Sequence, residues 1–157
     1  MSTTQWDTVL AVAVDDDRDH IQGPAEAAVT LVEYGDYECP YCGAAYPIVK
    51  DLQARMGDKL RFVFRNFPIS TSHPHAEQAA EAAEAGAAQG RFWEMHDTLF
   101  EHQEALEDDD LLLYAVEIGI DAGRCADEQI GGRWYAEHSH KGFLFGQRIQ
   151  AADGDGH

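Results

Sequence analysis

The sequence lacks long apolar runs and has few basic residues. Its longest early apolar stretch, residues 9–14, is far shorter than the ~20 residues that span a bilayer, and no positively charged segment precedes it. Only 11 basic residues, three of them lysine, accompany 29 acidic ones, which gives a net charge of −18. Because phosphate binding needs a basic surface, we expect no nucleic-acid partner. Because the apolar runs are short and no signal-peptide pattern is found, we expect no membrane insertion and a cytoplasmic location.

Cysteine is scarce, and its number is odd. Cys39, Cys42 and Cys125 are too few, among 157 residues, for a secreted scaffold held together by disulfides. The length predicts one domain over residues 1–157, with an acidic N-terminal segment at 1–18 and a disordered tail at 151–157. The composition, 45% hydrophobic and 25% charged, is typical of a globular protein.

The first half of the chain alternates strand and helix patterns. The β-branched, apolar run at 29–34 and the alternating run at 60–67 predict strands, and the apolar face of 40–56 predicts a helix between them, with a kink at Pro47. Residues 9–14 predict a further short strand. The order strand, helix, strand favours a βαβ unit with two parallel strands.

The second half of the chain is mainly helical in pattern. Helices are predicted at 76–89, around residues 92–100, and from 108 to 118, where three aspartates open the last helix; a turn follows near 121–128. We assign residues 74–130 to a helical insert. The last part, 133–157, is ambiguous, with a short strand near 142–145.

The sequence Cys39-Pro40-Tyr41-Cys42 lies between the strand at 29–34 and the helix that follows. Cys39 falls at the helix N-terminus, where free N–H groups and the helix dipole stabilise a thiolate, the species that attacks a disulfide. Cys42 follows one helical turn later and can close a ring with Cys39. This arrangement predicts thiol–disulfide chemistry in which Cys39 attacks and Cys42 resolves.

Other interpretations of these residues carry less weight. A structural zinc site needs four ligands and the chain has no second Cys-x-x-Cys, although His73 and His75 are the residues that would complete one. No metal or organic cofactor is expected. The residues Trp93, His96 and Phe100 have helical spacing, which is more typical of a hydrophobic core than of a site.

The segment 33–42, Glu-Tyr-Gly-Asp-Tyr-Glu-Cys-Pro-Tyr-Cys, resembles the DsbA-like branch of the thioredoxin superfamily. The segments 62–68, 73–76 and 92–97 resemble the same branch, and the likeness extends from about Asp19 to about Tyr135. Similar domains occur as free oxidoreductases and as extensions of bacterial sodium/proton antiporters. The resemblance implies an α/β thioredoxin-like fold with a helical insert, and thiols or disulfides of proteins or small molecules as partners.

The resemblance also implies roles for three further residues. Glu33 lies six residues before Cys39, where such proteins place a buried acid, and a carboxylate there can take the proton of the resolving thiol. The dipeptide Pro40-Tyr41 tunes the redox potential, and a neutral tyrosine predicts a less oxidising protein than the strongest members. Glu38, beside Cys39, acts in the same direction unless it points into solvent.

The family's Thr-Pro loop, which follows the insert, has no counterpart here, because all five prolines lie at or before Pro74. We therefore expect a central sheet of two or three strands, incomplete on its C-terminal side. A second hypothesis follows: a non-enzymatic, redox-responsive or interaction domain. Such a sheet predicts self-association, or a monomer in which the segment around 143–145 supplies a replacement strand.

Overall fold

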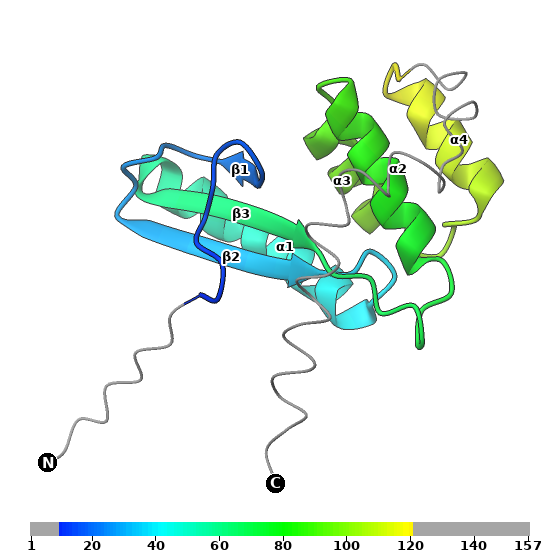
Figure 1. Ribbon diagram of the computed structural model, residues 1–157, viewed down its shortest axis with the longest axis horizontal. Coiled ribbons are helices and arrows are strands. Elements are labelled where there is room, and N and C mark those ends of the chain that lie inside the picture. Colours follow the sequence, from blue (N-terminus) through cyan, green and yellow to red (C-terminus); the bar gives the residue numbers. More distant parts are fainter. Residues whose placement is uncertain (1–9, 121–157) are drawn as a thin grey trace, which may run out of the picture.

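The computed structural model describes residues 10–120 of the chain. In this range three strands and four α-helices follow one another as β1 (His20–Gln22), β2 (Val29–Gly35), α1 (Pro40–Met56), β3 (Leu60–Asn66), α2 (Ala76–Ala88), α3 (Phe92–Glu101) and α4 (Asp108–Glu117), with a short 3₁₀ turn at Gly57–Lys59 (Figure 1). The predicted strands at 29–34 and 60–67 and the four predicted helices are thereby confirmed to within a residue or two.

The three strands form one sheet with β3 at its centre, in the order β1-β3-β2. β2 pairs with β3 in parallel, from Val29 opposite Leu60 to Gly35 opposite Asn66, and β1 pairs with β3 antiparallel. The parallel strand–helix–strand unit that the pattern predicted is confirmed. Within residues 10–120 no strand pairs with the other edge of β2, in agreement with a small sheet; the segments expected to form turns and strands beyond residue 120 lie outside the described residues.

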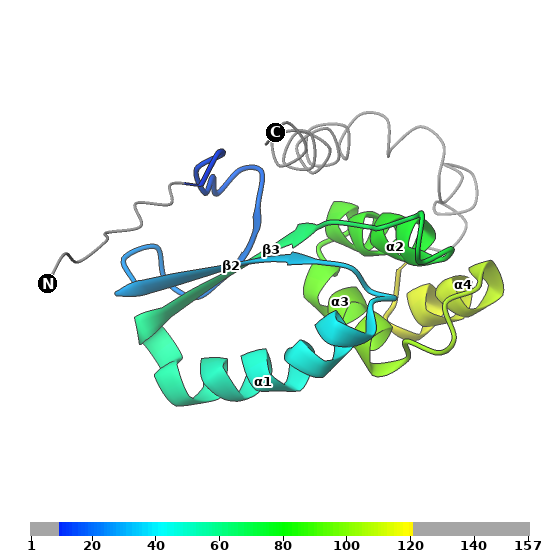
Figure 2. The same ribbon diagram turned by 90° about the horizontal axis from the view of Figure 1, so that it is seen from below.

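The helices place the beginning of α1 next to the insert. α1 runs along one face of the sheet, and α2, α3 and α4 gather beyond the carboxyl ends of β2 and β3 (Figure 2). Because β2 and β3 are parallel, their carboxyl ends lie at the same edge of the sheet. The loop after β2 meets the helices of the insert at this edge. The helix α1 is continuous from Pro40 to Met56, so Pro47 does not end it.

The core lies between β3 and the insert. Val63 is fully buried on one face of β3, and on the other face Leu60, Phe62 and Phe64 are each at most 3% exposed. They meet an aromatic cluster on α3: the ring of Phe62 lies 5.8 Å from that of Trp93, and the ring of Phe64 lies 4.5 Å from that of His96. The prediction that the aromatic residues of α3 form core is confirmed.

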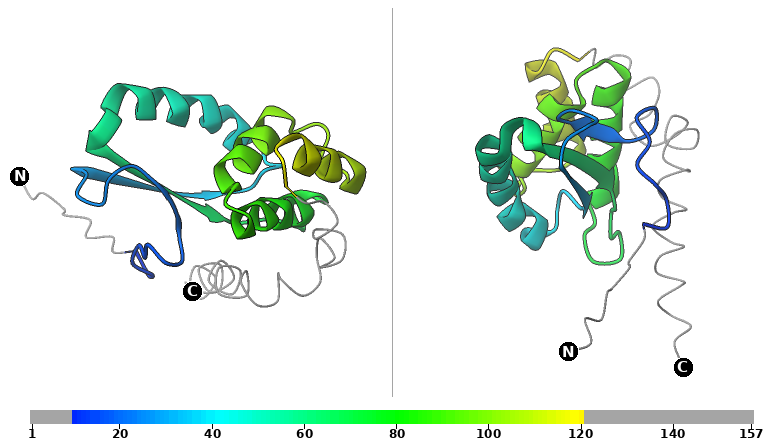
Figure 3. Two further views of the ribbon diagram at one scale, coloured as in Figure 1. Left: turned by 90° about the horizontal axis from the view of Figure 1, so that it is seen from above. Right: turned by 90° about the vertical axis from the view of Figure 1, so that its left-hand side faces the viewer.

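Residues 10–19 differ from the strand predicted over part of them. The expected strand at 9–14 is wrong over residues 10–14, and the first strand is β1. The segment crosses the face of the sheet opposite α1 (Figure 3). Its backbone carbonyls at Val12 and Ala13 accept hydrogen bonds from Arg65 on β3 at 3.2 Å each, so they bind a side chain instead of a neighbouring strand.

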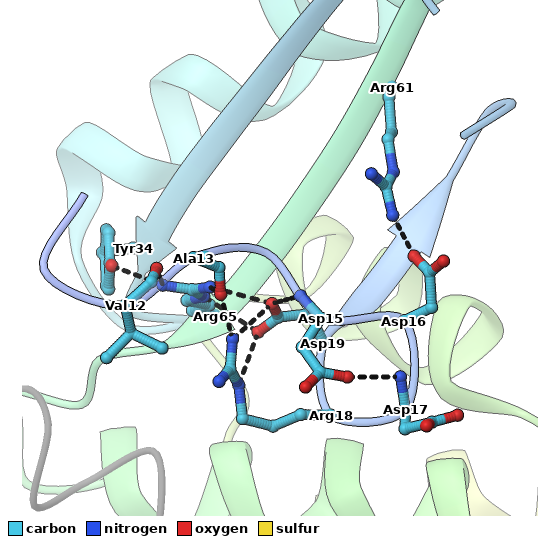
Figure 4. Close-up of polar contacts among 10 residues, drawn as sticks. All are labelled: Val12, Ala13, Asp15, Asp16, Asp17, Arg18, Asp19, Tyr34, Arg61 and Arg65. Atoms are coloured by element: carbon cyan, nitrogen blue, oxygen red, sulfur yellow. Dashed lines mark hydrogen bonds and ion pairs between the residues drawn. The ribbon is translucent and has the colours of Figure 1, made fainter. Parts of the chain in front are cut away.

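An ion cluster fixes this segment to the sheet (Figure 4). The Asp19 carboxylate accepts hydrogen bonds from Arg65 at 2.8 and 2.9 Å and from Arg18 at 2.8 and 3.3 Å, and its side chain is 3% exposed. Asp16 pairs with Arg61. Asp16 and Asp19 thus bind the two arginines on the outer face of β3, whose partly buried guanidinium groups need counter-charges.

Candidate active site

The loop after β2 places Cys39 at the helix start. Cys39 is the N-cap residue of α1, with extended backbone (φ −69°, ψ 121°), and Pro40 occupies the first turn. The carbonyl of Cys39 accepts the first intrahelical hydrogen bond, from the N–H of Gly43, at 3.0 Å. The proline needs no N–H partner at this position, and its fixed φ suits the helix start. Cys39 is therefore the residue at the N-terminal end of α1, and its side chain makes no capping hydrogen bond.

Cys42 lies one turn inside the helix in a less polar environment. Its half-buried side chain packs against the hydrophobic core, and burial raises the pKa of its thiol to about 11, with the nearby Cys39 and Glu33 contributing in the same direction. Cys39 and Cys42 are both free thiols. Both side chains are partly exposed, and the two thiols differ in their place in the helix, with one at the N-cap and the other one turn inside.

Glu33 projects from β2 in a half-buried position. Burial raises the pKa of its carboxyl group above the usual value. Its negative charge in turn raises the pKa of the Cys42 thiol, so the two groups are close enough to interact electrostatically. The arrangement brings together three sequence-derived candidates, Cys39, Cys42 and Glu33, while Tyr41 of the dipeptide points into solvent with 84% of its surface exposed.

Two carboxylates of the loop are paired with histidines. The buried Asp36, 3% exposed, accepts hydrogen bonds from the N–H groups of Glu38 (2.8 Å) and Ile69 (2.9 Å), and Nδ1 of His73 lies 2.7 Å from its Oδ2 atom. Glu38 accepts hydrogen bonds from the N–H of His75 at 2.6 Å and from its Nδ1 at 2.9 Å. These pairs hold the segment at 69–75 against the loop that precedes Cys39.

The pairing changes the interpretation of Glu38. We expected its charge to act on Cys39 unless the side chain pointed into solvent, and instead His75 lies against it, with the Glu38 side chain 19% exposed. Glu38 in return raises the pKa of His75. His73 and His75, considered as metal ligands from sequence, each bind a carboxylate. Among residues 10–120, no group of three His, Cys, Asp or Glu side chains forms a metal-binding cluster.

Gln103 is a site residue that the sequence did not indicate. It lies in the turn after α3, and its Nε2 atom donates hydrogen bonds to the carbonyls of Tyr37 (2.7 Å) and Cys39 (3.0 Å). No local pattern marks a glutamine in a turn as a partner of a loop more than 60 residues earlier. Asp36 was missed for the same reason, although a carboxylate shortly after a buried strand is a signal that could have been used.

Helices of the described part give no membrane-spanning candidate, because none is both long and apolar enough to cross a bilayer. Cys125 lies outside the described residues.

His96 is a core residue. Its side chain is 3% exposed, its Nδ1 atom lies 3.1 Å from the hydroxyl of Tyr37, and burial lowers the pKa of its ring to about 3.

Sequence comparison finds relatives much longer than this chain. A sodium/proton antiporter of Salinispora tropica, NhaA 3, is 52% identical over 128 residues, which are 79% of this chain and 20% of that protein. NhaA 1 of Salinispora arenicola is 54% identical over 115 residues, 73% of this chain and 18% of that protein. The chain therefore spans about a fifth of the length of the curated relatives it matches.

Structural comparison gives a second group of similar proteins. The thiol-disulfide exchange protein α-DsbA2 of Wolbachia pipientis superposes with a TM-score of 0.73 at 22% identity, over 90% of this chain and 74% of that one. A thioredoxin-like oxidoreductase of Silicibacter pomeroyi gives 0.72 at 27% identity, over 86% and 76%. Oxidised BdbD of Bacillus subtilis gives 0.71 at 25% identity, over 85% and 77%.

The family match covers the β2–α1–β3 unit, the insert and the loop that carries the paired cysteines. Residues 15–135, more than half of the chain, match the thioredoxin family. Together with the structural neighbours and the antiporter relatives, this match shows that the chain belongs to the thioredoxin family, as a DsbA-like domain of the kind appended to sodium/proton antiporters.

Proposed function

We propose that this chain is a thiol–disulfide oxidoreductase that works through Cys39-Pro40-Tyr41-Cys42. The observation that carries the proposal is the unequal environment of the two thiols at the start of α1. Both side chains are partly exposed, but Cys39 is the N-cap residue at the start of α1, whereas Cys42 lies one turn inside the helix with a pKa raised by burial to about 11. A pair with one thiol suited to attack and one kept protonated is what sequential exchange requires.

The first step uses Cys39 as nucleophile. Its thiolate attacks one sulfur of a substrate disulfide, the substrate S–S bond breaks, and a mixed disulfide with Cys39 forms. The departing substrate thiolate carries the electron pair of the broken bond and takes a proton from solvent. The helix dipole and the N–H groups at the start of α1 favour the negative charge on Cys39 before attack.

The second step uses Cys42 as the resolving thiol, with Glu33 as its base. With a pKa of about 11, the Cys42 thiol is protonated near neutral pH and needs a base to become nucleophilic. Glu33 is half-buried and interacts electrostatically with Cys42, which suits its carboxylate to receive the proton. Cys42 then attacks the Cys39 sulfur, the second substrate thiolate leaves, and the domain ends as the Cys39–Cys42 disulfide.

The net reaction transfers two electrons from the dithiol of the domain to a substrate disulfide, and it runs in reverse when a substrate dithiol reduces the domain. The partners are protein or small-molecule thiols and disulfides, with no metal or organic cofactor. Two structural neighbours, a thiol-disulfide exchange protein and a thioredoxin-like oxidoreductase, support the proposal at the level of fold.

Insulin reduction driven by dithiothreitol tests the proposal. The wild type is expected to accelerate insulin precipitation, and Cys39→Ser is expected to lose the acceleration because no thiolate remains to attack. Cys42→Ser should accumulate a mixed disulfide with the substrate that mass spectrometry detects. Cys125→Ser, which removes a thiol outside the motif, serves as the matched control and should retain turnover. Equal rates for the wild type and Cys39→Ser would refute the enzyme proposal.

A redox-responsive interaction domain is the second candidate. It is supported by the absence of any proline after Pro74 in this sequence, and by relatives that are named as antiporters rather than as oxidoreductases. In that case the motif would still cycle between dithiol and disulfide but would not turn over substrate. A reversible Cys39–Cys42 disulfide in a protein that shows no insulin reduction would favour this candidate over the first.

A further inference from the structure

The turn that follows α3 is connected directly to the loop that precedes α1. Gln103 donates two hydrogen bonds from one amide nitrogen, to the carbonyl of Tyr37 at 2.7 Å and to that of Cys39 at 3.0 Å. The carbonyl of Cys39 also accepts the first helical N–H of α1, from Gly43, at 3.0 Å. One side chain of the insert thus binds the backbone on either side of Glu38 and at the N-cap itself.

Gly43 makes this approach sterically possible. A Cβ atom built at Gly43 would overlap the Oε1 atom of Gln103, together with the adjacent carbonyl carbon of that side chain. A glycine here costs helix stability relative to alanine, because its backbone loses more entropy on folding. The missing side chain therefore creates the space in which the amide of Gln103 reaches the loop.

The two carbonyl contacts act on the nucleophile through its backbone. The position of the Cys39 thiol relative to the N–H groups of α1 depends on the extended conformation of its own residue (φ −69°, ψ 121°). An N-cap residue that loses its anchor samples other conformations, and its thiolate then spends less time next to the helix N-terminus. Stabilisation of the thiolate stabilises the reduced form, which makes the Cys39–Cys42 disulfide more oxidising.

We propose that Gln103 is a positioning residue for the redox pair, which sets the oxidising strength of the Cys39–Cys42 disulfide by fixing the carbonyls of Tyr37 and Cys39. The inference rests on the proposed oxidoreductase function and goes beyond it, because it assigns control of the exchange equilibrium to a residue of the helical insert. In this role Gln103 acts through the backbone of Tyr37 and Cys39.

The test is the equilibrium of the full chain with reduced and oxidised glutathione, quenched with acid and read by mass spectrometry of the peptide that contains both cysteines. Gln103→Met keeps the size of the side chain and removes its donor. We expect the disulfide form to be favoured about fivefold relative to the wild type at equal glutathione ratio, which corresponds to the two contacts stabilising the reduced form over the oxidised form by about one net hydrogen bond. Gln53→Met is the control, because Gln53 binds Gln22 at 2.8 Å near the other end of α1.

A double-mutant cycle separates positioning from general destabilisation. Gly43→Ala pushes the amide of Gln103 away from the carbonyls and should shift the glutathione equilibrium in the same direction as Gln103→Met. In a Gln103→Ala background the space is free, so the same alanine should cause no further shift. An effect of helix propensity alone would leave the equilibrium unchanged in both backgrounds. Gly43→Ala also keeps the test decisive if Gln103→Met does not fold.

The outcomes distinguish this inference from the proposed function. A wild type that fails to exchange with glutathione would overturn both. A wild type that exchanges, with Gln103→Met indistinguishable from Gln53→Met, would overturn the positioning role and leave the oxidoreductase function intact. Additive effects of Gly43→Ala and Gln103→Ala would also overturn it, because they would show that the two positions act independently.

Discussion

Asp19 holds the N-terminal segment to the sheet, and its removal should destabilise the whole domain. Its carboxylate accepts four hydrogen bonds from Arg65 and Arg18, and it is also bound by the N–H of Asp15 at 2.9 Å (Figure 4). These bonds outweigh the cost of burial and lower the pKa of Asp19 from 3.8 to about 2. Asp19→Asn keeps the shape of the side chain and removes the charge.

The magnitude follows from two arguments. The pKa shift corresponds to about 2 kcal/mol of unfolding free energy at neutral pH, at about 1.4 kcal/mol per unit. The substitution also leaves Arg65, whose side chain is 10% exposed, without its counter-charge, and breaking a buried pair on one side costs about 3–5 kcal/mol. We expect Asp19→Asn to lower the free energy of unfolding by about 2–4 kcal/mol.

The pH dependence has a definite sign. Because the folded pKa of Asp19 lies below its unfolded value, its contribution is complete above the unfolded pKa of 3.8 and is lost as the pH falls toward about 2. The difference between the wild type and Asp19→Asn should therefore be constant from about pH 7 to pH 5, and its charge-dependent part should fall to about half near pH 3. Urea unfolding under reducing conditions, followed by circular dichroism, measures it.

Asp17→Asn is the matched control. It removes the same charge from an exposed side chain two residues earlier, and a surface change of this kind should shift the unfolding free energy by less than about 0.5 kcal/mol. Equal stabilities of Asp19→Asn and Asp17→Asn would refute the reasoning. So would a large difference that stayed unchanged at low pH, because it would show that the carboxylate charge is not what fixes the segment.

Four further predictions follow from the structure. Alkylation of the reduced protein at mildly acidic pH should label Cys39 before Cys42, whose raised pKa of about 11 keeps it protonated, and peptide mass spectrometry showing Cys42 labelled first would contradict this. His96 titrates at about 3 in the folded protein against 6.5 when unfolded, so stability falls as the pH drops below 6.5, by up to about 1.4 kcal/mol per unit, and His96→Gln should flatten that slope in urea titrations. Gly35→Ala should destabilise the domain by about 1–3 kcal/mol in the same assay, because its Cβ would overlap the buried ring of Phe64; an unchanged midpoint would exclude that overlap. Self-association through the edge of β2 that no strand within residues 10–120 covers should strengthen with salt, since screening relieves the repulsion between chains of net charge −18, and light scattering that finds a salt-independent monomer would contradict it.

Local patterns in the sequence determined the elements and the reactive pair. The alternation at 60–67 and the β-branched run at 29–34 predict strands because each side chain's environment is set by its immediate neighbours along the strand. The helix start at Cys39-Pro40 was predictable for the same reason, because capping preferences act within one turn. The position of Cys39 at the N-cap therefore required no knowledge of the rest of the fold.

Contacts between distant segments were decided only by the tertiary structure. Glu38 was expected to act on Cys39 as a lone charge, but His75, 37 residues later, pairs with it. Residues 10–14 have the composition of a strand, yet their carbonyls bind Arg65, because the edge of β3 was taken by β1. Gln103 reaches the N-cap from the far end of α3. The sequence specifies which groups can form hydrogen bonds. The packing of the insert against the sheet selects their partners, because a local sequence pattern contains no information about a residue that is distant along the chain.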